Sequence, residues 1–204
     1  MRALALDEVA SLLAVEFLLD PAGGEQEDAQ IIFFELDGGY IAGTIVVESG
    51  AQFIAGDGNS PPRPPRGQDE SLPESVRLPI MTPRKFRDYL DLFGRFDERF
   101  VEYYTPDVVF AADPAPVQLH GREAVLELYR PLRAELGENV TVHHLAIDNE
   151  AGIMIAALSN CLTAFGNVKL PSRQLGPGDQ LALSGAIIYE LREGAICRIR
   201  DVGG

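Results

Sequence analysis

The stretch from Tyr104 to Val125 limits the possible folds of this chain more than any other. It begins with an acidic turn and continues as an apolar strand over Asp107–Ala112, which a loop with two prolines interrupts. Val117–His120 is then predicted to be a short edge strand, because proline next to a strand is tolerated at the edge of a sheet. Gly121 opens a helix in which apolar residues recur at helical spacing. The stretch therefore predicts the point where an α+β domain begins its sheet.

Two helices are predicted ahead of this stretch. Thr82 can cap the first helix, Pro83 suits its first position, and apolar side chains from Phe86 to Phe93 recur along one face. Gly94 ends this helix. The second helix is short and carries aromatic side chains on one side and acidic side chains on the other.

Four antiparallel strands are predicted after the third helix, over residues 140–147, 153–165, 181–191 and 195–202. They are rich in apolar residues and bounded by polar turns. A polar loop over residues 166–180 separates the two strand pairs. The order of helix, helix, strand, short strand, helix and four strands describes a complete domain over residues 81–204.

The first quarter of the chain, residues 1–49, is predicted to contain strands only. Ser11–Leu19 is a continuous apolar run, and Ile31–Leu36 and Tyr40–Val47 flank an Asp-Gly-Gly turn, as in a hairpin. Residues 50–80 are predicted to be a linker, because their proline- and glycine-rich composition leaves too little apolar surface to bury.

An internal repeat connects the first quarter to the complete domain. Leu4–Asp7 matches Leu145–Asp148, and Phe34–Ile41 matches Tyr189–Ile196. The second pair of segments is further apart in the sequence than the first pair. The difference corresponds to an insertion in the polar loop. Residues 1–49 are therefore predicted to be a partial repeat, the strands-only second half of the domain. Such a half must cover its exposed face by packing on the complete copy or on another chain. The alternative is that apolar strands with acidic turns simply look alike.

Residues 81–204 resemble the SnoaL-like branch of the nuclear transport factor 2-like superfamily. The segments that carry the resemblance are Phe86–Phe93, Asp97 with Phe100, Tyr104–Phe110, His120–Val125 and Gly185–Leu191. The resemblance implies a cone-shaped, curved antiparallel sheet with three helices, an apolar pocket inside the cone, and usually a homodimer across the outer face of the sheet. The superfamily includes ketosteroid isomerases, polyketide cyclases, scytalone dehydratases and limonene epoxide hydrolases beside noncatalytic members, so the fold alone does not define a reaction.

The resemblance also implies candidates for proton abstraction next to a carbonyl group, which needs a base and a donor for the developing oxyanion. Tyr89 falls near the oxyanion-hole tyrosine of the ketosteroid isomerases, and Asp113 falls near their base aspartate once an insertion is allowed. Their second oxyanion acid falls on Ala186, which counts against steroid isomerisation. An aspartate before proline is also a common turn residue, and an inward tyrosine on a helix is also a common core residue.

The three histidines are further candidates for proton transfer. His120 ends the short strand, and strand alternation sends the neighbours His143 and His144 to opposite faces, so at most one of these two points into the cone. His144 and His120 are candidate partners of Asp113, and surface or interface roles are the alternative. No ligand spacing predicts a metal site, and no cofactor is expected.

Aromatic and polar side chains of the predicted cone are candidates for ligand contacts: Phe93, Phe100, Phe110, Asn160 and Tyr189. Which strand residues face inward depends on a register that the sequence leaves open. The first hypothesis for function is a cofactor-free isomerase, cyclase or dehydratase acting on a small, mostly apolar carbonyl compound. The alternative is a noncatalytic ligand-binding or dimerisation module, which a cone filled by its own phenylalanines would favour.

Charge and cysteine content limit the partners and the compartment. With 31 acidic and 17 basic residues, the formal net charge is -14, which argues against a nucleic-acid partner. The apolar start of the chain is interrupted by Asp7 and Glu8 before a signal peptide or membrane span could form. We therefore expect a cytoplasmic protein without a membrane partner, either a homodimer or a chain whose partial repeat packs intramolecularly. Cys161 and Cys197 are interpreted as reduced, buried residues.

Overall fold

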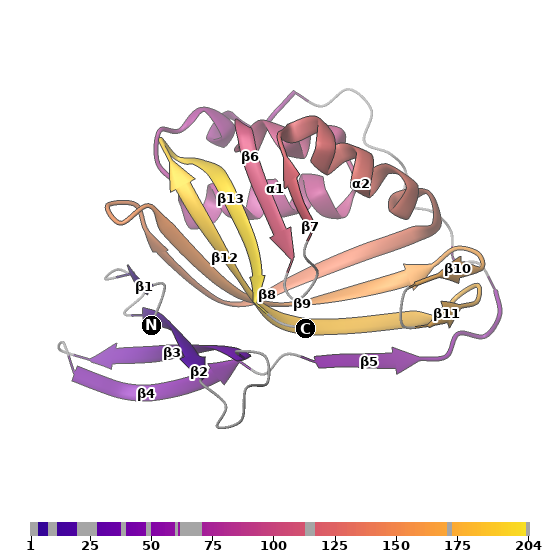
Figure 1. Cartoon of the computed structure of the whole chain (residues 1–204), viewed down its shortest axis with the longest axis horizontal. Coiled ribbons are helices and arrows are strands. Elements are labelled where there is room, and N and C mark those ends of the chain that lie inside the picture. The colour runs from indigo at the N-terminus through magenta and orange to yellow at the C-terminus, as the bar shows by residue number, and fades with distance from the viewer. Residues whose placement is uncertain are drawn as a thin grey trace.

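A curved sheet of seven strands organises the protein. The computed structural model describes residues 4–7, 12–19, 28–37, 40–47, 50–59, 61, 71–112, 117–170 and 173–202. The strands follow the order β7-β6-β13-β12-β9-β8, and β5 pairs with β12 outside that path. Figure 1 shows the helices on the concave side of this sheet, here called the inner face, and a second sheet below the opposite, outer face.

The bounds of the elements agree closely with the sequence pattern. The helices are η1 (Glu74–Arg77), α1 (Pro83–Gly94), η2 (Glu98–Tyr103) and α2 (Arg122–Glu135). The strands of the large sheet are β5 (Gly50–Ile54), β6 (Tyr104–Ala112), β7 (Val117–His120), β8 (Leu136–Asp148), β9 (Ile153–Ala164), β12 (Gln180–Arg192) and β13 (Ala195–Val202). A separate hairpin within the predicted polar loop consists of β10 (Val168–Lys169) and β11 (Gln174–Leu175).

The helix starts follow their predicted chemistry. The Thr82 side chain accepts a hydrogen bond from the Lys85 amide at 3.0 Å, and Pro83 occupies the first position of α1. Gly121 precedes α2 with a φ of 85°, a left-handed conformation that glycine adopts without strain. The predicted second helix is a 3-10 helix, η2, capped by the Asp97 side chain.

The large sheet is mixed, so the prediction of a purely antiparallel sheet was wrong. β13 pairs with β6 in the parallel direction, with Ile199 opposite Phe110 and Asp201 opposite Ala112. The other pairs in this sheet are antiparallel. A parallel pair requires a long crossover connection, and here the chain between β6 and β13 passes through α2 and three long strands.

The N-terminal strands form a sheet of their own. β1 (Leu4–Asp7), β2 (Leu12–Leu19), β3 (Asp28–Asp37) and β4 (Tyr40–Val47) are joined as an antiparallel meander in that order. Strands were predicted for this region, and β3 and β4 form the predicted hairpin. Their relation to the second half of the complete domain as a repeat stays a prediction.

This N-terminal sheet lies against the outer face of the large sheet. β1 and β2 contact β8, and β3 contacts β13 (Figure 1). Small and apolar side chains of the outer face are almost completely buried: Ala146, Ile155, Ala157, Ala186 and Ile188. The arrangement is a packing of two sheets within one chain, which removes apolar surface from water.

The start of the predicted linker is ordered by pairing with the large sheet. β5 pairs antiparallel with the first half of β12. The Gly56 amide then donates a hydrogen bond to Asp179 Oδ1 at 2.6 Å, and the Gly176 amide donates to Asp179 Oδ2 at 2.7 Å. A side chain at Gly56 would overlap the backbone of Gly178, so glycine allows this close approach. We call this set of contacts the Asp179 latch.

The Asp179 latch predicts a specific titration. The two backbone hydrogen bonds lower the pKa of Asp179, so the latch contributes stability above the ordinary aspartate pKa and loses it as pH falls through the lowered value. In NMR titrations we expect the Gly56 and Gly176 amide shifts to move together below about pH 3.9. Asp179→Asn should abolish this movement. A midpoint at or above the ordinary aspartate pKa would contradict the latch.

Candidate functional site

The inner face carries a cluster of aromatic rings beneath the helices. Phe100 has no exposed surface, and its ring centroid lies 5.2 Å from that of Phe93 and 5.8 Å from that of Tyr104. Phe110 packs against the same cluster, with its ring 6.5 Å from Tyr129. The predicted ligand residues Phe93, Phe100 and Phe110 are therefore brought together, chiefly in contact with one another.

Tyr89 lies in the middle of this aromatic cluster. Its hydroxyl group is 2.9 Å from the Tyr104 hydroxyl group, and both residues are almost fully buried. Burial raises the pKa of both tyrosines, so both phenols stay protonated. As sequence analysis predicted, Tyr89 is an inward phenol on the first helix, and its hydroxyl group is shared with Tyr104. Asp113, the predicted base, lies outside the described residues, so its pairing with Tyr89 stays a prediction.

The histidines do not face the aromatic cluster. A β-bulge between Val142 and His144 places His144 opposite Ala157, on the outer face. His143 Nε2 lies 3.0 Å from the hydroxyl group of Ser159, which also faces outward. The prediction that alternation separates these histidines was wrong, because a bulge adds one residue and shifts the alternation by one.

His120 also lies away from the inner face. It is exposed at the end of β7, the edge strand, as predicted for this strand. It pairs with Val109, whose neighbours Val108 and Phe110 point into the aromatic cluster. Since neighbouring residues of a strand point to opposite faces, His120 shares the outer face with Val109. The described geometry therefore does not join His120 to Tyr89.

Tyr189 and Asn160 both belong to the inner face. Tyr189 is 2% exposed, and its ring packs edge-on against Phe86 at 5.3 Å. Asn160 lies further along the sheet, between the inward residues Leu158 and Leu162 of β9. Of the predicted polar residues, Asn160 is the one beside a buried charge.

Asn160 is part of a buried polar group that sequence reasoning missed, here called the Glu138 cluster. Glu138 of β8 accepts a hydrogen bond from Asn160 Nδ2 and forms an ion pair with Arg133 of α2. The side chains of Arg133 and Glu138 are only 3% and 7% exposed. The Arg133 guanidinium carbon lies 4.6 Å from the ring centre of Phe93. Two opposite charges and an amide thus meet in an apolar surrounding.

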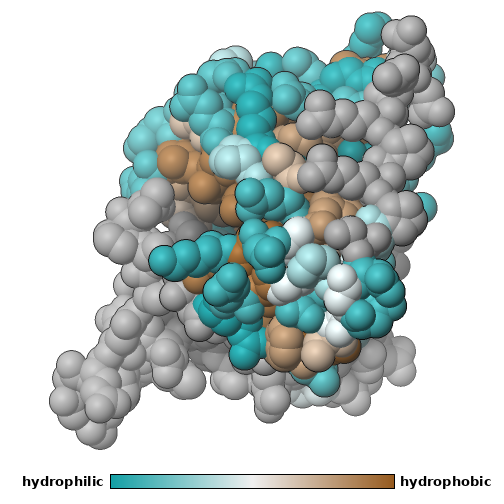
Figure 2. All heavy atoms as spheres, turned by 90° about the vertical axis from the view of Figure 1, so that its right-hand side faces the viewer, coloured by the Kyte–Doolittle hydropathy of each residue, from teal (hydrophilic) through white to brown (hydrophobic). Residues whose placement is uncertain are grey.

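The Glu138 cluster lies where two apolar clusters meet on the inner face. Val140 and Leu158 belong to the aromatic core beneath the helices, whereas Leu136 and Leu162 belong to a second core beneath the β10–β11 hairpin. Glu138 alternates with Leu136 and Val140 along β8. Figure 2 looks at the end of the molecule where this hairpin lies and shows apolar surface between hydrophilic side chains.

Burial dominates the electrostatics of the Glu138 cluster. Burial raises the pKa of Glu138, and this effect exceeds the opposite influence of Arg133 and Asn160. Arg133 Nε and Asn160 Oδ1 are buried and have no hydrogen-bond partner among the described residues. A buried donor and a buried acceptor beside the carboxyl group therefore each need a partner that these residues do not supply.

A signal for the Glu138 cluster does exist in the sequence. Glu138 interrupts an alternating apolar pattern, and Arg133 lies one turn after Tyr129 on the same face of α2. Each charge alone looks like a surface residue at the junction of a helix and a strand. Only their common burial shows that they form a pair.

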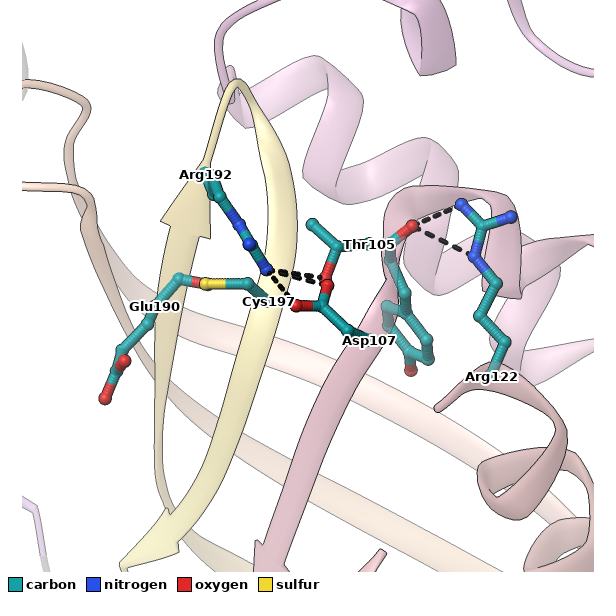
Figure 3. A network of polar contacts seen from close by, with 7 residues as sticks. Thr105, Asp107, Arg122, Glu190, Arg192 and Cys197 are labelled. Atoms are coloured by element: carbon teal, nitrogen blue, oxygen red, sulfur yellow. Dashed lines mark hydrogen bonds and ion pairs between the residues drawn. The ribbon is translucent and has the colours of Figure 1, made fainter. Parts of the chain in front are cut away.

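A second polar network holds the start of β6 in place. Arg192 Nη2 donates hydrogen bonds to both carboxylate oxygens of Asp107 at 2.7 and 2.8 Å, and Arg122 Nε donates to the Tyr104 carbonyl oxygen at 3.1 Å. Figure 3 shows Arg192 reaching across from β12 to Asp107, with Arg122 on the other side of β6. Asp107 is part of an exposed ion pair, which agrees with a structural role for the acidic turn.

A cavity of about 300 Å³ lies near this network, at the turns that lead into β9 and β13. Its described lining consists of Ala151, Gly152, Ile153, Ile188, Glu190, Leu191, Cys197 and Arg200. None of these residues was a predicted site residue. Burial raises the pKa of the Cys197 thiol, which donates a hydrogen bond to the Glu190 carbonyl oxygen at 3.4 Å. Both cysteines are free, as predicted, but they are half-buried and not buried as expected.

Two features are absent from the described part of the chain. Its His, Cys, Asp and Glu side chains contain no group of three or more that could hold a metal ion. Its helices include none that is long and apolar enough to cross a membrane.

Comparison with known proteins places the similarity in the large sheet and its helices. Residues 86–199 match the model of the SnoaL-like domain family. Among curated proteins, none matches the chain.

Solved structures are similar over somewhat more than half of the chain. A protein provisionally named a polyketide cyclase, from Xanthomonas campestris pv. campestris, is 18% identical with a TM-score of 0.49, covering 57% of this chain and 84% of its own. A provisionally named isomerase from Bacillus subtilis is 16% identical with a TM-score of 0.45, covering 57% and 81%. An LEH-like epoxide hydrolase from M. tuberculosis is 16% identical with a TM-score of 0.44, covering 58% and 78%.

Proposed function

We propose that this chain, which belongs to the family of SnoaL-like domains within the nuclear transport factor 2-like superfamily, binds a small, mostly apolar carbonyl compound on its inner face and moves a proton on it. It would act without a cofactor, as an isomerase or cyclase. The observation that carries the proposal is the buried carboxyl group of Glu138, whose pKa is raised in an apolar surrounding. A carboxyl group with a raised pKa can both accept and return a proton near neutral pH.

The neighbours of Glu138 supply the remaining parts of such a reaction. The carboxylate removes a proton from the carbon next to the carbonyl group, and the electron pair moves to the carbonyl oxygen. A guanidinium donor of Arg133 can stabilise the oxyanion, since Arg133 Nε is buried and unpartnered among the described residues. Asn160 orients the carboxyl group through its Nδ2 hydrogen bond. The pair predicted from the sequence, Asp113 as base and Tyr89 as donor, stays the alternative assignment for the proton transfer.

A noncatalytic ligand-binding module is the second candidate, and the aromatic packing favours it. Phe86, Phe93 and Phe100 are 1%, 7% and 0% exposed and contact their aromatic neighbours. Because these rings fill the helix-covered end of the inner face, a ligand would bind beside the Glu138 cluster. Both candidates therefore share one binding place and differ in proton transfer.

Glu138→Gln separates the two candidates. We expect the wild-type protein to accelerate deuterium exchange at the α-carbon of a ketone in D₂O, followed by NMR across a panel of small aryl and alkyl methyl ketones. Glu138→Gln should lower this rate by about a hundredfold or more while ligand-induced shifts of the protein persist. The matched control is Glu135→Gln, an exposed glutamate at the end of α2, which should leave the rate unchanged.

The other outcomes each have a defined meaning. Ketone binding without exchange in the wild type would support the noncatalytic module. Loss of exchange in Asp113→Asn but not in Glu138→Gln would assign the base to Asp113. Absence of both binding and exchange across the panel would overturn the proposal.

A further inference from the structure

The N-terminal part of the chain contributes a strand to the surface that carries the Glu138 cluster. Phe53 of β5 pairs with Leu181 of β12, Leu181 pairs with Leu162 of β9, and Leu162 pairs with Glu138 of β8. Directly paired residues of neighbouring strands point to the same face of a sheet. Phe53 and Glu138 therefore lie in one row of side chains on the inner face.

Phe53 is an exposed residue at the edge of the sheet and not part of a core. It is 41% exposed, whereas Leu181 beside it is 7% exposed under the β10–β11 hairpin. The guanidinium carbon of Arg173 lies 4.3 Å from the centre of the Phe53 ring. An exposed ring with a cation on it is suited to hold another aromatic group by stacking.

A neighbouring row of partly buried side chains lies between the Phe53 ring and the Glu138 cluster. Asn160 pairs with Leu183, which pairs with position 51 of β5, two residues before Phe53. Asn160 and Leu183 are only partly buried. Two strand spacings separate β9 from β5, which amounts to roughly 10 Å. A molecule that reaches from Asn160 to Phe53 is therefore about two aromatic rings long.

β5 is held in a fixed position by two sets of contacts. All five of its residues pair with β12, from Gly50 opposite Ser184 to Ile54 opposite Gln180. The Asp179 latch then fixes the chain immediately after the strand, through Gly56. The backbone that carries Phe53 is thus held in place without a ligand. This order lowers the entropic cost of binding a molecule against the Phe53 ring.

We propose that Phe53 and Arg173 form the far wall of the ligand site and select elongated aryl ketones. The distal ring of such a compound stacks on Phe53, while its carbonyl group lies at Asn160 and Glu138. This inference rests on the proposed function, because it uses the Glu138 cluster as the polar end. It also gives the N-terminal segment a direct part in ligand recognition.

The test compares two probes and two variants of one strand. Para-acetylbiphenyl is long enough to span the site, and acetophenone lacks the distal ring. Phe53→Ala should weaken para-acetylbiphenyl binding about tenfold, measured by isothermal titration calorimetry, and leave acetophenone binding unchanged. The matched control is Ile54→Ala, because Ile54 is 45% exposed on the same strand and points to the opposite face.

The outcomes distinguish this inference from the function on which it rests. If Glu138→Gln slows α-carbon exchange on either probe while Phe53→Ala changes the affinity for neither, the role of Phe53 is wrong and the Glu138 site stands. Equal losses of affinity for para-acetylbiphenyl in Phe53→Ala and Ile54→Ala would also contradict the proposed role of Phe53, since they would reflect damage to β5. If neither probe binds the wild-type protein, the site itself has failed.

Discussion

Replacement of Arg133 by methionine is expected to lower the free energy of unfolding by about 3–5 kcal/mol at neutral pH. The substitution keeps an apolar stem against Phe93 but leaves the Glu138 carboxylate buried without its cation. The cost of a buried, unpaired charge exceeds what the ion pair itself contributes. Urea denaturation followed by circular dichroism measures the loss.

The pH dependence of this loss provides an internal check. Glu138 already has a raised pKa, and removal of Arg133 raises it further, so stability is fully present at low pH and is lost as pH rises through the raised value. Arg133→Met should therefore be least destabilising at low pH and more destabilising as pH rises above the ordinary glutamate pKa. Arg133→Met combined with Glu138→Leu should recover most of the stability, because an apolar pair can replace a buried ion pair.

Arg130→Met is the matched control for Arg133→Met. Arg130 lies on the same helix, and it pairs with Glu98 and Glu123, but its side chain is 42% exposed. Exposed ion pairs contribute little to stability, so the free energy of unfolding of this variant should be close to that of the wild type. Equal losses at positions 130 and 133 would contradict a special role for the buried pair.

Phe100→Ala is expected to lower the free energy of unfolding by a similar amount, about 3–5 kcal/mol. Phe100 has no exposed surface and contacts Phe93, Tyr104 and Tyr89, so the substitution leaves a cavity that these rings cannot close. The free energy of unfolding from urea titration again provides the measurement. Phe53→Ala removes the same atoms from an exposed position and should cost less than about 1 kcal/mol.

The comparison of Phe100→Ala with Phe53→Ala also tests the architecture. If both variants lost the same small amount of stability, the helix-covered end of the inner face would be loosely packed. It could then hold a ligand where the structure places aromatic rings. A large difference would show that the rings at this end are tightly packed and leave no room for a ligand among them.

Local chemistry explains why much of the fold could be predicted. Thr82 and Pro83 start α1 as expected, because capping and a fixed φ act within one turn. The last strand has the predicted bounds, Ala195–Val202, because glycine ends the turn before it. The parallel pairing of β6 with β13 was missed, since strand direction follows from the path of the whole connection over residues 113–194.

The site was harder to predict than the fold, because it depends more on contacts between segments that lie far apart in the sequence. Tyr89, Phe93 and Phe100 were recognised as inward residues, because helical periodicity shows one apolar face. His144 was a candidate partner for proton transfer, but one bulged residue places it on the outer face. A bulge depends on the neighbouring strand and leaves little trace in a single strand's pattern.

The sequence by itself determined the element order, the apolar faces and the resemblance to SnoaL-like domains, because these depend on neighbours within a few residues. Only the tertiary structure decided that Arg133, Glu138 and Asn160 meet, and that β5 brings Phe53 into the same sheet. Both results depend on strand register, which is set by the packing of distant segments against each other. The chemistry of this protein therefore resides in contacts between parts of the chain that no local pattern connects.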